Sequence, residues 1–347
     1  MNYRILELEA SQLFAKQSNK TQILITNSIQ TDIYRTRQTH VYEVRTISEI
    51  IAKKIGFEKM EELAYVSMSH DIGHPPFGHR GAKVLDKLFK DLGLNEGFSD
   101  NNNNLQMIEH NELSANDYEL VSLIKYPKKL YPDQKKKYLP LLNRMVDKEK
   151  KLWGQNLKRT VACNIMDIAD EIAYTTSDLY DSFSTGYTKA YLPPYFKNLV
   201  NKYKSEPKLF SVLNSIITAA ENDYKRVLRN EIFKLKMILT ESLFWDYEVS
   251  NLKFKSKLYQ DLLTDIFNFT YKFFINNSSI EKKKVKASKK LIKLTNYFLN
   301  NGPDYFPSDM YRYKYNISKT QEEKLRVVRD MVSDTTDNFI LNYKIKD

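Results

Sequence analysis

The chain has 347 residues, of which 42% are hydrophobic and 28% are charged, a composition typical of a globular protein with a substantial buried core. No apolar run approaches the roughly 18 residues that a membrane span requires. The single cysteine, Cys163, excludes an intrachain disulfide framework. We therefore expect a cytoplasmic protein that does not associate with membranes. The net charge of +11 favours anionic partners, either nucleotides or nucleic acid.

The chain is predicted to be all-α, with at most a short β-hairpin near residues 21–34. Apolar residues recur at helical spacing over residues 40–55, 58–71, 159–183, 255–276 and 283–299, and again near the C-terminus. The polar stretches 91–104 and 127–135 are predicted to be loops. We expect one helical core over residues 1–190 and a helical region over residues 191–347 that packs on it and serves oligomerisation or substrate specificity.

The histidines are concentrated in the N-terminal third of the chain. Three of the five lie in the decapeptide HDIGHPPFGH at 70–79, and His40 stands near the start of a predicted helix. Imidazole and carboxylate groups are ligands that suit divalent ions such as zinc, manganese and iron. Because a helix is expected to end before Gly73, the side chains of His70 and Asp71 can both point toward one metal ion, with His40 as a third ligand. A fourth, oxygen ligand is expected from elsewhere in the chain.

The predicted helix 159–183 carries a row of polar residues at spacings of three and four, which places them on one face. The row consists of Asp167, Asp170, Tyr174, Asp178 and Asp181. A solvated surface face is one explanation of such a row. The apolar residues between them indicate burial instead, and a row of buried acids requires a cation.

Four blocks of this sequence resemble the HD superfamily of phosphohydrolases, and within it the deoxyguanosine triphosphate triphosphohydrolase branch. They are SQLFAKQSNKTQ at 11–22, RTRQTHVYEV at 35–44, HDIGHPPFGH at 70–79 and IMDIADEIAYTTSDLYD at 165–181, with a weaker fifth, SLIKYP, at 122–127. The blocks occur in the family's order and span roughly residues 11–190. The resemblance implies an HD-domain helical core with a helical C-terminal extension.

The resemblance also implies a role for individual residues. His40, His70, Asp71 and Asp170 correspond to the four protein ligands of one divalent metal ion, which can be manganese, magnesium, iron, cobalt or zinc. His74 and His79 correspond to catalytic residues over the α-phosphate. The implied substrate-binding residues are Gln22, Arg37, Asn101, Lys125, Tyr126, Tyr174 and Asp178.

The implied reaction is hydrolysis of a deoxynucleoside triphosphate to deoxynucleoside and inorganic triphosphate. The family further implies a homo-oligomer and, in some members, binding of single-stranded DNA. The sequence departs from the family where a glutamate usually follows the last histidine of the decapeptide by three residues, since this chain has Ala82 there. Asp86 and Glu43 are the candidate replacements. Two alternative functions are therefore kept: a catalytically attenuated HD protein that binds nucleotide or single-stranded nucleic acid, and an HD phosphodiesterase or nucleotidase acting on other phosphate esters.

Overall fold

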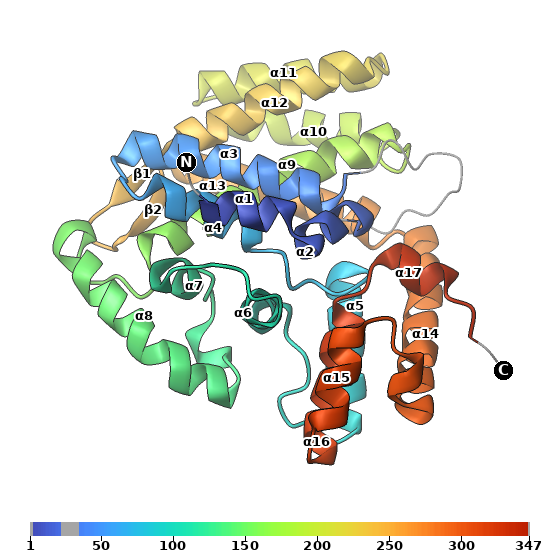
Figure 1. Ribbon diagram of the computed structural model, residues 1–347. Coiled ribbons are helices and arrows are strands. Elements are labelled where there is room, and N and C mark those ends of the chain that lie inside the picture. Colours follow the sequence, from blue (N-terminus) through green and yellow to red (C-terminus); the bar gives the residue numbers. More distant parts are fainter. Residues whose placement is uncertain (1–2, 22–34, 346–347) are drawn as a thin grey trace. The chain divides into compact units, whose positions relative to one another are not determined.

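The computed structural model describes residues 3–21 and 35–345, and this part of the chain is predominantly helical (Figure 1). The prediction of an all-α fold is confirmed. The strands named within the described residues form one antiparallel pair, β1 (Leu243–Asp246) and β2 (Asn251–Phe254), where the sequence pattern predicted none. Most of the hairpin predicted near residues 21–34 lies outside the described residues. At its edge, Thr21 pairs with Thr36 in an isolated antiparallel bridge.

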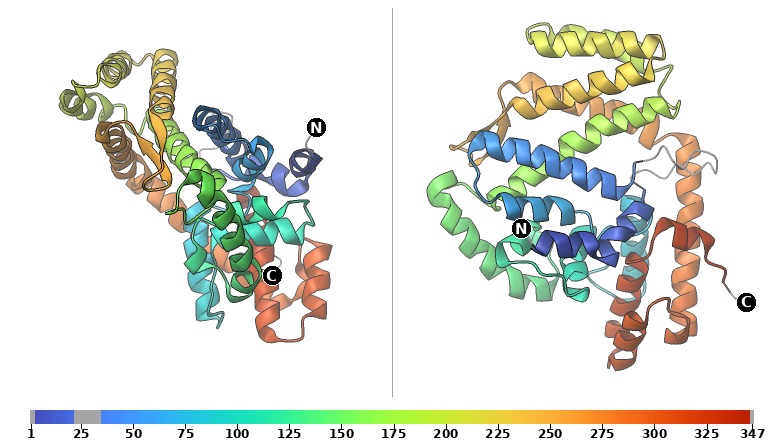
Figure 2. Two further views of the ribbon diagram at one scale, coloured as in Figure 1. Left: turned by 90° about the vertical axis from the view of Figure 1, so that its left-hand side faces the viewer. Right: turned by 45° about the horizontal axis from the view of Figure 1, so that its top comes forward.

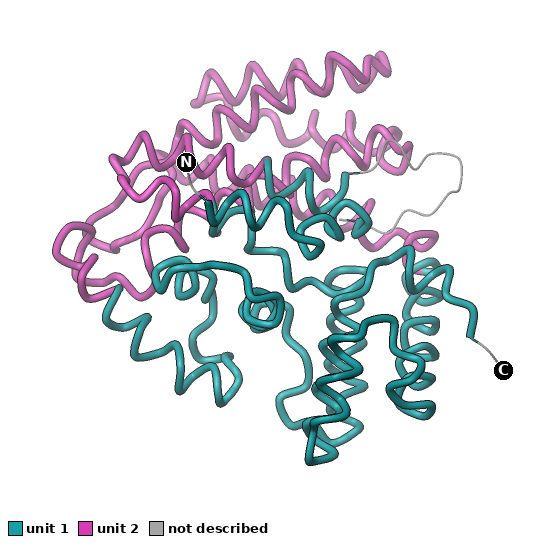
Figure 3. The backbone as a smooth tube through the Cα atoms, viewed as in Figure 1, with its two compact units in different colours: residues 1–42, 65–145, 282–347 teal, residues 43–64, 146–281 magenta. Residues whose placement is uncertain are grey.

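The chain forms two compact units, each assembled from separate stretches of sequence (Figure 3). The first unit contains residues 1–42, 65–145 and 282–347, and the second contains residues 43–64 and 146–281. Four helices have residues in both units: α3 (Arg37–Ile55), α4 (Met60–Ser69), α8 (Pro132–Trp153) and α14 (Ser278–Asn301). The boundary predicted near residue 190 stays a prediction.

The remaining α-helices of the first unit come from both ends of the chain. They are α1 (Tyr3–Ala10), α2 (Gln12–Ala15), α5 (Gly78–Asp91), α6 (Asp100–His110), α7 (Asp117–Ser122), α15 (Asp309–Ile317), α16 (Gln321–Ser333) and α17 (Asp337–Asn342). The polar stretches predicted as loops are shorter than expected, because α6 already begins at Asp100 and α8 at Pro132. Ser99 caps α6 by accepting a hydrogen bond from the Asn102 amide.

Apolar residues of α5, α14 and α16 form a core in the first unit, where these helices lie side by side (Figure 2). The core includes Leu85 and Phe89 of α5, Leu291 and Phe298 of α14, and Val328 of α16, and each of them is fully buried. Burying a side chain of this size contributes about 1.5–3 kcal/mol. The C-terminal helices are therefore an integral part of the unit that contains the clustered histidines.

The second unit is built around α9 (Val161–Ser184), whose apolar face is buried. α12 (Lys225–Glu241) and α13 (Lys257–Thr270) pack on α9, and α13 is followed by a π-helical turn at Tyr271–Ile275. α11 (Pro207–Glu221) packs on α12, and α10 (Leu192–Val200) packs on α11. Thr160 caps α9 through the Cys163 amide. The strand pair is fixed by Trp245, whose indole N–H donates to the Trp153 carbonyl at 3.0 Å. Among the described helices, none combines the length and the apolar character needed to cross a bilayer.

Candidate metal centre and catalytic histidines

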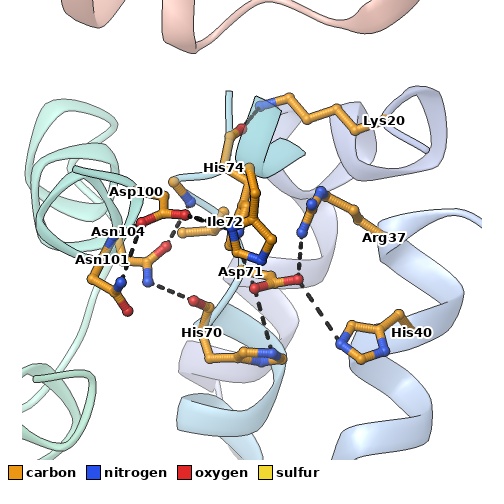
Figure 4. Close-up of polar contacts among 12 residues, drawn as sticks. Lys20, Arg37, His40, His70, Asp71, Ile72, His74, Asp100, Asn101 and Asn104 are labelled. Atoms are coloured by element: carbon orange, nitrogen blue, oxygen red, sulfur yellow. Dashed lines mark hydrogen bonds and ion pairs between the residues drawn. The ribbon is translucent and has the colours of Figure 1, made fainter. Parts of the chain in front are cut away.

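Three residues predicted as metal ligands or catalytic groups, His70, Asp71 and His74, lie on a tight turn between α4 and α5 (Figure 4). His70 and His74 are in this turn, and His79 follows in the first turn of α5. Gly73 permits a close approach of α6, because a Cβ atom there would lie 2.3 Å from the backbone nitrogen of Asn104. The Gly73 N–H donates to the Asn104 side-chain oxygen at 2.7 Å. The first turns of α6 therefore hold the histidine-bearing turn by backbone contact.

Two residues that the sequence analysis did not single out also hold this turn. The buried ammonium group of Lys20 donates to the His74 carbonyl at 2.6 Å and to the Ser333 carbonyl at 3.3 Å. Asp337 accepts a hydrogen bond from the Phe77 amide at 2.8 Å. Phe77 has a φ of 64°, a left-handed conformation that is uncommon for residues other than glycine. Lys20 and the adjoining ends of α16 and α17 thus stabilise the loop that carries His74.

His40, His70 and Asp71 form a buried cluster of metal-ligand atoms. One nitrogen or oxygen atom from each lies within 4.8 Å of the others. His70 Nε2 is 3.5 Å from Asp71 Oδ1, and His40 Nε2 is 3.9 Å from Asp71 Oδ2. The structure therefore brings together three of the four predicted ligands. Two imidazoles and one carboxylate in a buried cluster fit the ligand preference of zinc, manganese or iron.

The His70 ring is oriented by the backbone of α4. Its Nδ1 atom lies 2.7 Å from the Ser67 carbonyl oxygen, and because a carbonyl oxygen can only accept, Nδ1 carries the proton. Nε2, the atom that faces Asp71, is then the nitrogen with a lone pair for a metal. Contacts of this kind fix the tautomer and orientation of metal-ligating histidines. This orientation also favours a metal site.

Asp71 contacts a guanidinium and an imidazole. Arg37, itself buried, donates to Asp71 Oδ2 at 2.6 Å, and His74 Nδ1 lies 3.1 Å from Asp71 Oδ1. Burial by itself raises the pKa of Asp71, but the charges of His74, His70 and Arg37 outweigh it and hold that pKa well below its usual range. Asp71 is therefore a carboxylate at neutral pH, as a metal ligand must be.

His74, His79 and Asp100 form a second cluster next to the first. Asp100 Oδ2 lies 3.2 Å from His74 Nε2 and 3.1 Å from His79 Nδ1, and the two imidazole rings meet edge to face. Burial raises the pKa of Asp100, but His74 and His79 more than offset this and lower it. Burial and the charge of Arg37 lower the pKa of His74. Asp100 was missed in the sequence analysis because residues 91–104 were interpreted as a loop.

The predicted substrate-binding residues of the first unit lie on three segments. Asn101 follows Asp100 on α6 and donates its side-chain amide to Asp100 Oδ1 at 3.1 Å. Lys125 and Tyr126 follow α7; Tyr126 is exposed, and the Lys129 ammonium lies 5.0 Å from the centre of its ring. Arg37 begins α3. Gln22 lies outside the described residues.

The predicted residues Asp170, Tyr174 and Asp178 lie on α9, in the second unit. Their spacing of four residues puts them on one face of this helix. Asp178 is buried, and the Tyr174 ring contacts that of Phe267 edge to face at 6.3 Å. Burial raises the pKa of Tyr174 above its usual value. The roles of these three residues stay predictions.

Comparison with known proteins finds that residues 37–175 match the HD domain family. A deoxyguanosinetriphosphate triphosphohydrolase-like protein from Leptospira interrogans is 26% identical, over 95% of this chain and 84% of its own length. A protein of the same name from Syntrophus aciditrophicus is 24% identical over 96% of this chain and 83% of its own length. A third, from Mesorhizobium japonicum, is 31% identical over 50% of this chain and 44% of its own length.

Proposed function

We propose that this HD-domain protein hydrolyses dGTP-like deoxynucleoside triphosphates to deoxynucleoside and inorganic triphosphate at a single metal site. The buried cluster of His40, His70 and Asp71 carries the proposal, since its ligand atoms lie within 4.8 Å of one another. The two further histidines beside it and the similarity to triphosphohydrolase-like proteins over most of the chain support it. We propose Asp170 as the fourth ligand, on the basis of the sequence resemblance.

A divalent ion at this site would polarise a phosphate oxygen and lower the pKa of a bound water. Arg37, whose guanidinium reaches Asp71, would place positive charge beside the phosphates, where it stabilises the charge that develops during bond cleavage. Lys125 is proposed as a further phosphate contact.

His74 and His79 would accept and donate the protons that are transferred during the reaction. Water adds to the α-phosphorus, and the bond from that phosphorus to the 5′ oxygen of the sugar breaks. The proton released by the water and the proton taken up by the 5′ oxygen balance, so the two products need no other reactant. Imidazoles can donate and accept protons near neutral pH.

The remaining residues are assigned to the sugar and base. We propose that Gln22 and Asp178 contact the 3′-hydroxyl and that Tyr174 lies against the sugar, where it would exclude a 2′-hydroxyl. Asn101 would be a further substrate contact, and Tyr126, like Lys125, would lie near the phosphates. These assignments distinguish a deoxynucleotide hydrolase from an HD phosphodiesterase or nucleotidase, which has no use for such contacts.

Product analysis tests the proposal. The purified chain is incubated with each of the four deoxynucleoside triphosphates and with manganese, magnesium, iron, cobalt or zinc in turn, and the products are separated by chromatography. We expect a deoxynucleoside and intact triphosphate, formed only when a metal is present. Release of monophosphate and pyrophosphate would contradict the proposal. A panel of monophosphates and cyclic dinucleotides tests the phosphodiesterase alternative in the same assay.

A second candidate function, binding of single-stranded nucleic acid, is favoured by one surface feature. α14 exposes Lys282, Lys286, Lys289 and Lys293, whose spacings of four, three and four place them on one face. Such a row suits a phosphate backbone, and binding through it would weaken steeply with salt. We expect Lys286→Glu to reduce the affinity for single-stranded DNA in filter binding; equal affinity at low and high salt would contradict this function. Homo-oligomer formation stays a prediction.

A further inference from the structure

The second histidine cluster contains a carboxylate that the sequence analysis did not assign. Asp100 Oδ2 contacts the ring nitrogens of both His74 and His79. The His79 side chain is 80% exposed, whereas that of Asp100 is only 14% exposed. The partly buried carboxylate of Asp100 therefore contacts one ring nitrogen of His79, whose imidazole is otherwise exposed.

Neither candidate that the sequence offered as a replacement for the family glutamate is in this position. Ala82 has no proton-carrying group, and it packs against the core of the first unit. Asp86 accepts a hydrogen bond from the Phe98 amide at 3.0 Å and pairs with Lys90. Glu43 belongs to the second unit, where it accepts hydrogen bonds from Ser177.

The first turn of α6 fixes the orientation of Asp100. Asp100 Oδ1 accepts hydrogen bonds from the backbone and side-chain amides of Asn101, at 2.9 and 3.1 Å, which leaves Oδ2 directed at the histidines. The helix is itself attached to the histidine turn, because Asn103 donates to the Gly73 carbonyl at 2.7 Å and Asn104 donates to the His70 carbonyl. These bonds hold Asp100 beside the turn that carries His74 (Figure 4).

We propose that Asp100 is the positioning residue for His79, and that it supplies from α6 the carboxylate that Ala82 cannot supply from α5. The contact places the proton of a neutral His79 on Nδ1 and so leaves Nε2 as the nitrogen that exchanges a proton with the substrate. A carboxylate in this place also stabilises the imidazolium that forms during turnover. This role of Asp100 rests on the proposed hydrolytic function and specifies how His79 is oriented for it.

Kinetics of three variants test the role in turnover. An amide at position 100 can donate to His79 Nδ1 and so favours the unproductive tautomer. Asp100→Asn should therefore lower kcat by about 100-fold or more while KM changes little. Ala82→Glu introduced into the Asp100→Asn background should restore a large part of kcat, which a merely structural loss would not allow. Asp100→Glu is the conservative variant and should retain more activity than Asp100→Asn. Wild-type kcat in Asp100→Asn, or no recovery in the double variant, would overturn the proposal.

A second readout does not depend on turnover. Long-range proton–nitrogen NMR correlations report which nitrogen of His79 is protonated, and we expect Nδ1 in the wild type and a shift toward Nε2 in Asp100→Asn. An unchanged tautomer would overturn the proposal. If the wild type hydrolyses no deoxynucleotide, the proposed function fails, and the tautomer still decides whether Asp100 orients His79. A second bound metal ion that is lost in His79→Ala would also overturn the proposal, because the cluster would then be a ligand set.

Discussion

Replacing Asp337 by alanine should destabilise the histidine turn by about 3 kcal/mol. Its carboxylate accepts three hydrogen bonds, from the Phe77 amide at 2.8 Å and from the Thr21 amide and hydroxyl at 3.0 and 2.7 Å. The Phe77 amide is buried, and leaving it without an acceptor costs about 1–3 kcal/mol. The Thr21 donors are only partly buried, and losing their hydrogen bonds costs about 0.5–1 kcal/mol each. The left-handed conformation of Phe77 is then no longer held.

Hydrogen exchange is the appropriate assay, because a chain with two compact units can unfold in more than one step. In Asp337→Ala, protection of the amides around Phe77 should fall by about 100-fold, the equivalent of about 3 kcal/mol. The matched control is Asp309→Ala, since Asp309 is 92% exposed and pairs only locally with Arg312; it should change protection by less than about 0.5 kcal/mol. Protection in Asp337→Ala within about twofold of the wild type would refute this reasoning.

Three further predictions follow from the same unit. Burial lowers the pKa of Lys20 to about 8 from its usual 10.5. Between these two pH values the unfolded chain binds more protons than the folded chain, so the free energy of unfolding rises with pH. Urea unfolding of Lys20→Met should lack this part of the rise, which is on the order of 3 kcal/mol. A Cβ atom on Gly81 would lie 1.8 Å from the Pro76 carbonyl oxygen. Gly81→Ala must therefore displace the turn that carries His74, and it should lower kcat by about 100-fold. An unchanged kcat would argue against a role for this turn in catalysis. His70→Ala should weaken manganese binding by more than about 100-fold in calorimetric titration, whereas His110→Ala, outside both histidine clusters, should leave it unchanged.

The sequence predicted the elements that have strong local patterns. Apolar periodicity located α3 and α9 to within a few residues, since an amphipathic face repeats within the helix itself. The cluster of His40, His70 and Asp71 could also be predicted, because His70 and Asp71 are adjacent in sequence and His40 lies in the first turn of α3. The strand pair was missed because each strand has only four residues, too few for an alternating pattern to be recognised.

The missed residues depend on tertiary structure. Asp337 contacts the Phe77 amide across 260 residues of sequence, and no local pattern records such a contact. Asp100 stands in a run of asparagines whose polarity suggested a loop. Its best local signal was Ser99, which is a preferred helix N-cap residue, followed by the apolar Leu105 and Ile108 at helical spacing. This signal would have predicted that Asp100 begins a helix, but not that its carboxylate lies beside His79.

Hydrolysis in water enriched with isotopically heavy oxygen tests the central claim most directly. If the site around His40, His70 and Asp71 directs water to the α-phosphorus, mass spectrometry should find one heavy oxygen atom in the triphosphate and none in the deoxynucleoside, with metal-loaded protein only. Heavy oxygen in a monophosphate or in the deoxynucleoside, or equal turnover after the metal is removed, would contradict the account.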